Sequence, residues 1–263
     1  MNKDLTIGNP GKSLIMFTIP LFISVMFQQM YNIADSVIAG KFAGEDALAA
    51  IGASYPITMI FMAVAVGCQI GCSVVISKHF GSGNMQMTKT CISTSLISGT
   101  VLSAILTLVG VLFSGVFMQW VQTPANIFDD GCLYLMIYTG GFIFLFLYNI
   151  VTGIFNSLGD SKTPLYFLIL TSALNIGLDL LFIIPFQMGV LGAALATDIS
   201  QVVSGVLSFL YLSRKFDVLK MQKSDFAYSK KACTRLLGIG IPMGLQCSIT
   251  AIGSVIMQWA VNV

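Results

Sequence analysis

The chain alternates long apolar runs with short polar segments. Seven apolar runs cover residues 13–39, 48–77, 91–117, 131–156, 163–184, 190–213 and 235–263. About 20 apolar residues can cross a bilayer, and runs this long satisfy their backbone groups in lipid only as helices. The alternation expected of membrane β-strands is absent. The pattern predicts an all-α polytopic membrane protein.

Composition supports this prediction and excludes several classes of protein. The chain is 56% hydrophobic and 9% charged, whereas a soluble domain carries about 25% charged residues. Its six cysteines form no C-x-x-C pair and have no histidine partners at metal spacing, so they are expected to act as small apolar residues. We expect no cofactor and no nucleic-acid partner.

The basic residues predict how the chain is oriented. Of its 13 lysines and arginines, only Lys41 falls on one side of the expected spans, and the other twelve fall on the opposite side. Basic loops remain cytoplasmic, so we expect a cytoplasmic N-terminus in a multi-pass protein of the plasma or inner membrane. The loops expected on the outer side, where Lys41 lies, carry acids, including Glu45 and Asp129.

The chain divides into two unequal parts. Residues 1–213 are predicted to form a six-helix lobe, 214–234 a basic cytoplasmic linker, and 235–263 the first helix of a second, pseudo-symmetric lobe. The opening "SLIMFTIPLFIS" is matched by "RLLGIGIPMGLQ" when Pro20 is aligned with Pro242, as in duplicated transporters. We therefore interpret the chain as a fragment. The basic stretch 214–235 is either a simple connection or a contact for anionic lipid headgroups.

Three acids fall inside the expected spans: Asp35, Asp179 and Asp198. A charge at mid-membrane costs about 2.5–3.5 kcal/mol on insertion scales. Such acids tend to be protonated, to face a wet cavity or to bind a cation.

Other polar residues share helical faces with these acids. The first span carries Pro20, Ser24, Gln28, Asn32 and Asp35; the fifth carries Thr171, Asn175 and Asp179; and the sixth carries Thr197 beside Asp198. A rise of 1.5 Å per residue places Asp35, Asp179 and Thr197 in the outer half of the membrane, where they can form one cluster. This cluster could share a proton or hold Na⁺ through its oxygens. The alternatives are an interfacial acid at Asp35, hydrogen bonds between helices at Asn175 and Asp179, and a separate contact for Asp198.

Four segments together resemble the multidrug and toxic compound extrusion (MATE) family: "QQMYNIADSVIAGKFAGEDALAAIG", "FNSLGDSKTP", "LNIGLDLLFI" and "GAALATDISQ". The resemblance implies twelve helices in two lobes. It also implies efflux of cationic, amphipathic small molecules in exchange for inward H⁺ or Na⁺. We would then expect a membrane-embedded monomer that includes the missing C-terminal lobe.

The resemblance also assigns roles to residues. It implies a coupling-ion site of Asp35, Asn175, Asp179 and Thr197, which would be the ligands if the ion is Na⁺. Tyr134 joins this network, with Tyr138 as a rival, and Pro20 is where the first helix bends. Gln28, Asn32 and Asp198 are further candidates for the network. The acid that some branches carry in the seventh helix is absent from 235–263.

Other functions are weighed against this one. A related flippase for a lipid-linked saccharide would need a cavity rich in Arg and Lys, which the spans lack. A seven-helix receptor would place the N-terminus outside. An intramembrane enzyme is disfavoured because the only histidine, His79, lies in a loop and no H-E-x-x-H or G-x-S-x-G motif is present.

Overall fold

The computed structural model describes residues 10–215 and 228–262, and every regular element in these ranges is helical. The helices are α1 (Pro10–Ile38), α2 (Glu45–Gly81), α3 (Met85–Trp120), α4 (Phe128–Gly140), α5 (Phe142–Ser157), α6 (Lys162–Ile183), α7 (Gly189–Lys215) and α8 (Lys230–Asn262). A five-residue π-helical turn, η1 (Ala39–Ala43), follows α1.

The prediction of an all-α membrane protein is confirmed. Five helices are long and apolar enough to cross a membrane (α1, α2, α3, α6 and α7), and there are six such spans if the bent pair α4–α5 is counted as one. The seventh expected run coincides with α8, which begins at Lys230, so residues 230–234 are helical rather than part of the linker. Residues 216–227 of that linker lie outside the described residues. The division into lobes stays a prediction.

The fourth expected span, 131–156, is two helices rather than one. α4 ends at Gly140, α5 begins at Phe142, and their axes differ by 46°. The turn between them is closed by short-range hydrogen bonds, from Gly141 N–H to the carbonyl of Ile137 and from Phe144 N–H to the carbonyl of Gly141. Two consecutive glycines lower the cost of this break because they lack side chains.

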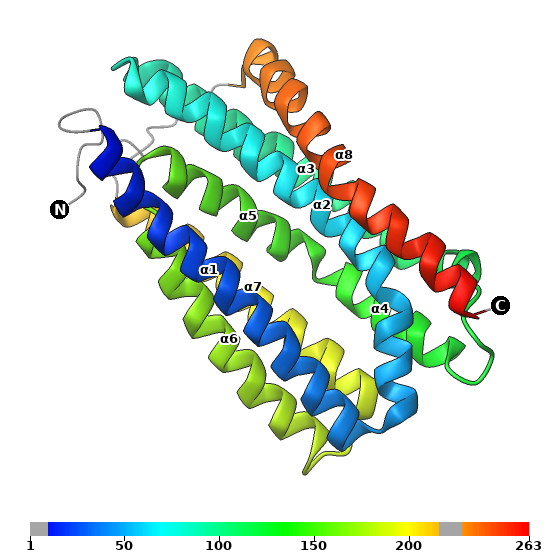
Figure 1. Cartoon of the computed structure of the whole chain (residues 1–263). Helices are drawn as coiled ribbons and strands as arrows, with labels where there is room; N and C mark the ends of the chain where they lie inside the picture. The colour runs from blue at the N-terminus through cyan, green and yellow to red at the C-terminus, as the bar shows by residue number, and fades with distance from the viewer. Residues whose placement is uncertain (1–9, 216–227, 263) are drawn as a thin grey trace.

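The helices run along one another in a single elongated bundle (Figure 1). α1 and α6 pack together, α7 lies between α6 and α5, and α2 packs on α5, α3 and α8. The main apolar core lies among α2, α3, α4 and α5, where the Phe61 and Phe142 rings meet edge to face at 5.3 Å. This leaves the outward face of α1 uncovered, with Phe22 and Ile33 each 64% exposed.

Glycines allow α2 and α8 to approach closely. A methyl group at Gly67 would lie 2.5 Å from the carbonyl oxygen of Gly240, and one at Gly71 would lie 2.5 Å from that of Leu236. The G-x-x-x-G at 67–71 therefore faces a second one at 240–244. Small residues of this kind let helix backbones pack against each other.

Candidate functional site

The two acids at the centre of the site come from separate helices. Asp35 lies near the end of α1 and Asp179 near the end of α6, and the two helices are neighbours. Their carboxyl groups lie close enough to share a hydrogen bond. Two carboxylates cannot bond in this way unless one holds a proton, because an ionised carboxylate only accepts. The contact is therefore a place where a single proton can be held.

Asn175 and Thr197 join α6 to α7 beside these acids. In the amide orientation that satisfies both of its ends, Asn175 donates to Asp179 Oδ2 at 3.1 Å and accepts from the backbone N–H of Thr197 at 3.2 Å. Asn175 is 1% exposed and Asp179 is fully buried. A buried polar group needs such partners, so the pair fixes the position of the Asp179 carboxyl.

Two tyrosines complete the cluster. Tyr31 lies one turn before Asp35 on α1, and its hydroxyl lies near Thr197. Tyr134 of α4 is buried within electrostatic range of Asp35 and Asp179. Sequence reasoning did not single out Tyr31, although its i, i+4 spacing to Asp35 was a usable signal. Tyr138, the rival of Tyr134, stacks on it with ring centres 6.2 Å apart.

The cluster keeps free oxygens. Asp35 Oδ1 and Asp179 Oδ1 are both shielded from solvent and have no hydrogen-bond partner among the described residues. Hard cations such as Na⁺ prefer oxygen ligands, so these atoms suit either a proton or a sodium ion. No group of three or more His, Cys, Asp or Glu side chains that could hold a metal ion occurs in the described part of the chain.

Asp198 lies outside this cluster. Its carboxyl group packs against Gly141, where a methyl group would lie 2.4 Å from Asp198 Oδ1. It therefore faces the α4–α5 break and Tyr138, one helical step of 100° away from Thr197. Its Oδ1 is buried and has no hydrogen-bond partner among the described residues.

The other α1 candidates are placed as follows. Pro20 is buried inside the continuous helix, and its carbonyl accepts a hydrogen bond from Ser24 Oγ at 2.8 Å. Gln28 is half-buried, and among the described residues it has no hydrogen bond to the acids. Asn32 is exposed, and because three residues turn a helix through 300°, its side chain lies 60° around α1 from that of Asp35.

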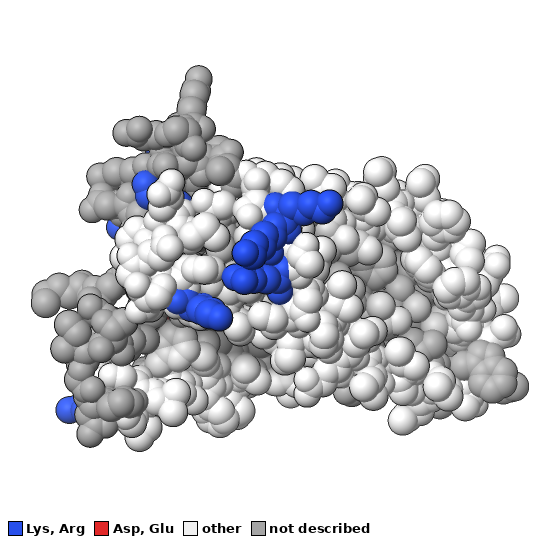
Figure 2. Space-filling model, turned by 90° about the horizontal axis from the view of Figure 1, so that it is seen from above, with Lys and Arg blue, Asp and Glu red and all other residues white. Residues whose placement is uncertain are grey.

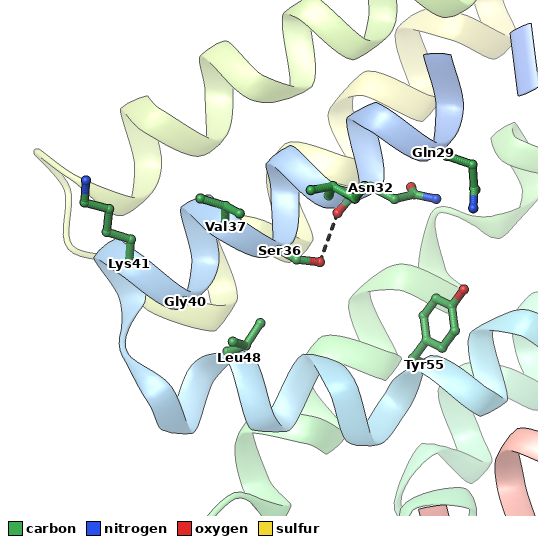
Figure 3. Close-up of a pocket in the computed structure, with 9 residues that line it drawn as sticks. Gln29, Asn32, Ser36, Val37, Gly40, Lys41, Leu48 and Tyr55 are labelled. Atoms are coloured by element: carbon green, nitrogen blue, oxygen red, sulfur yellow. Dashed lines mark hydrogen bonds between the residues drawn. The ribbon is translucent and has the colours of Figure 1, made fainter. Parts of the chain in front are cut away.

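Asn32 instead lines a groove between α1 and α2 (Figure 3). The groove has a volume of about 590 Å³ and is open on one side. Gln29, Asn32 and Ser36 of α1 face Tyr55 and Leu48 of α2 across it, with Lys41 at the far end. The lining therefore mixes amide, hydroxyl and aromatic groups and contains no acid.

The MatE family model matches residues 20–181. The probable multidrug resistance protein YoeA of Bacillus subtilis (strain 168) is 26% identical over 258 residues, which are 95% of this chain and 56% of that protein. The FAD transporter of Shewanella oneidensis is 27% identical over 255 residues, which are 94% of this chain and 56% of that protein.

Solved structures agree. A MOP superfamily transporter from Pyrococcus furiosus matches with a TM-score of 0.87 and 27% identity, over 94% of this chain and 54% of that one. The chain thus spans about half the length of the relatives it matches. With more than half of its residues matched by the family model, the chain belongs to the MatE family, whose members are transporters rather than enzymes.

Proposed function

We propose that the full-length protein is a secondary active transporter that exports small, cationic or amphipathic compounds in exchange for inward H⁺ or Na⁺. The coupling ion is held by Asp35 and Asp179, with Asn175, Thr197 and Tyr134 around them. The observation that carries this proposal is the close approach of the half-buried Asp35 carboxyl group of α1 to the buried Asp179 carboxyl group of α6. An ion bound there can tie a change in charge to a movement of α1.

The mechanism requires that binding alters the helix. With neither proton nor Na⁺ bound, two adjacent carboxylates repel each other, so Asp35 and Asp179 would separate. α1 has few packing contacts on its outer face and contains Pro20, whose missing N–H weakens the helix at that point. Ion exchange at the cluster is thereby expected to bend α1 near Pro20. That movement would change the shape of the groove between α1 and α2.

The groove supports the proposed class of substrate. Tyr55, which is 51% exposed, offers an aromatic face to a cation, and Gln29 and Asn32 offer amide oxygens. A flippase for a lipid-linked saccharide would need several basic residues to hold pyrophosphate, whereas this lining has only Lys41. One similar protein is named for multidrug resistance and another for FAD transport, so the substrate itself has to be measured.

The test uses full-length protein in proteoliposomes and follows the efflux of a cationic dye under separate H⁺ and Na⁺ gradients. We expect Asp35→Asn and Asp179→Asn each to abolish gradient-driven efflux, because an amide cannot exchange a proton and binds Na⁺ weakly. Asp129→Asn, in an exposed acid at the start of α4, is the matched control and should transport like wild type. Normal efflux in both site variants would refute the proposal.

A further inference from the structure

Basic side chains gather where α2, α3 and α8 meet at one end of the bundle. α8 carries Lys230 and Lys231 in its first turn and Arg235 one turn later, and all three are exposed. Lys78, also exposed, lies in the last turn of α2. Figure 2 shows lysines and arginines grouped on this part of the surface, with no acid visible on that face of the described residues.

Packing of the helices brings these residues together. The α2 stripe that contacts α8 runs through Gly67 and Gly71, and Gly71 touches the carbonyl of Leu236. Lys78 follows Gly71 by seven residues, or almost two full turns, so it lies on the same stripe. Because the two helices run in opposite directions, Lys78 is level with the beginning of α8.

The start of α8 is also fixed against α3. The backbone N–H of Ser229 donates to Thr94 Oγ1 at 3.1 Å, and Ser229 Oγ accepts from the N–H of Ala232. Arg235 lies within electrostatic range of Cys91, near the start of α3. The basic residues are thus held on a packed junction of three helices.

The charges at this junction favour the binding of an anion. The N-terminus of a helix carries a partial positive charge, and α8 begins with two lysines and no acid in its first turn. Asp160, a described acid in a neighbouring connection at this end, forms an ion pair with Lys215 and so does not neutralise the basic residues of α8. Lys78, Lys230, Lys231 and Arg235 make no ion pair with any described residue.

We propose that Lys78, Lys230, Lys231 and Arg235 form a binding site for the phosphate headgroup of an anionic phospholipid. Lys78 lies at the end of a candidate membrane span, where headgroups are found, and the three basic residues of α8 lie level with it. Basic pockets between helices bind such headgroups. Tyr228, 54% exposed beside them, has the amphipathic character of residues at the membrane interface. The site is independent of the proposed ion coupling.

The test measures binding of fluorescent phosphatidylglycerol and phosphatidylcholine to the full-length protein in detergent. Wild type should prefer phosphatidylglycerol. The triple variant K78Q/K231Q/R235Q should bind it about 100-fold more weakly, since each basic residue near the surface contributes about fivefold. The matched control K12Q/K162Q/R214Q removes the same charge from exposed residues elsewhere at this end and should retain wild-type affinity. The charge-preserving K78R/K231R/R235K separates loss of charge from loss of folding and should also bind.

Three results would overturn the inference. Equal loss in the two neutralised triple variants would show that only net charge matters. Equal binding of the two lipids by wild type would show that the junction does not select anions. Tight binding of inorganic phosphate in the absence of lipid would assign the site to a soluble anion instead.

Discussion

Asp160, in the connection between α5 and α6, offers a sharp test of how this end of the bundle is held together. Its Oδ1 accepts from the backbone N–H of Thr163 at 3.1 Å, and its Oδ2 accepts from Thr163 Oγ1 at 2.6 Å and from Lys215 Nζ at 2.7 Å. The carboxylate thus joins the start of α6 to the end of α7. In Asp160→Asn, an N–H₂ group would replace Oδ2, so Thr163 Oγ1 and Lys215 Nζ would face a donor instead of the acceptor they now have.

The size of the effect follows from this geometry. Asp160 is 8% exposed, while the Lys215 side chain is 27% exposed, so the pair is only partly shielded from water. Breaking a fully buried pair costs about 3–5 kcal/mol, and one hydrogen bond to a charged group contributes about 1.5–3 kcal/mol. We therefore expect Asp160→Asn to destabilise the protein by about 2–3 kcal/mol, or to lower Tm by about 4–12 °C for a chain of this length.

The same contact predicts a pH dependence. Burial alone would raise the pKa of Asp160, but the hydrogen bonds from Lys215 and Thr163 outweigh it and the pKa lies below its ordinary value. The stabilising contribution is then fully present above the unfolded pKa of about 3.9 and is lost as pH falls through the lower folded value. The difference between wild type and variant should be constant from about pH 5 to 8 and shrink below about pH 4.

Thermal unfolding of the purified protein in detergent provides the assay, with Lys215→Met and the double variant completing a cycle. The double variant should be less destabilised than the sum of the single variants, because both remove the same contact. Additive single effects, or a difference that persists unchanged to pH 3, would refute the reasoning. Lys162→Gln, an exposed residue beside Asp160, is the matched control and should leave Tm unchanged.

Two further variants test the close packing and the edge of the ion site. Gly67→Ala should lower Tm by several degrees, since its new methyl would lie 2.5 Å from the carbonyl oxygen of Gly240 and such overpacking costs about 1–3 kcal/mol. Gly52→Ala, with open space around it, should leave Tm unchanged. An equal fall in Tm in both variants would contradict the contact between α2 and α8. Tyr31→Phe should weaken ion coupling in the efflux assay by removing the hydroxyl that lies near Thr197. Tyr166→Phe, at a residue that is 66% exposed, should have no effect, and unchanged coupling in Tyr31→Phe would exclude the Tyr31 hydroxyl from the site.

The sequence predicted the helices well because long apolar runs are a strong and local signal. It predicted the neighbourhood of Asp35, Asn175, Asp179 and Thr197 because their depth in the membrane can be counted from the span ends. It did not predict the break at Gly141, since two glycines in a helix do not determine whether it bends. The break accompanies a long-range contact with Asp198 that no local pattern reveals.

The sequence also could not predict which neighbouring helix each side chain of α1 faces. Asn32 was grouped with Asp35 on spacing alone, yet it lines the groove toward α2. Tyr31, the residue before Asn32, lies near Thr197 instead. The orientation of α1 against α6 decides which of its side chains are packed and which are open. That orientation depends on tertiary packing.

The central claim is that Asp35 and Asp179 hold the ion that is exchanged for substrate. The most direct measurement counts the ions released when substrate is added to purified full-length protein in weakly buffered detergent solution, with a pH indicator for H⁺ and ²²Na⁺ for sodium. The account predicts release of about one ion of either kind per protein in wild type, and none in Asp35→Asn or Asp179→Asn. Release equal to wild type in both variants would contradict it.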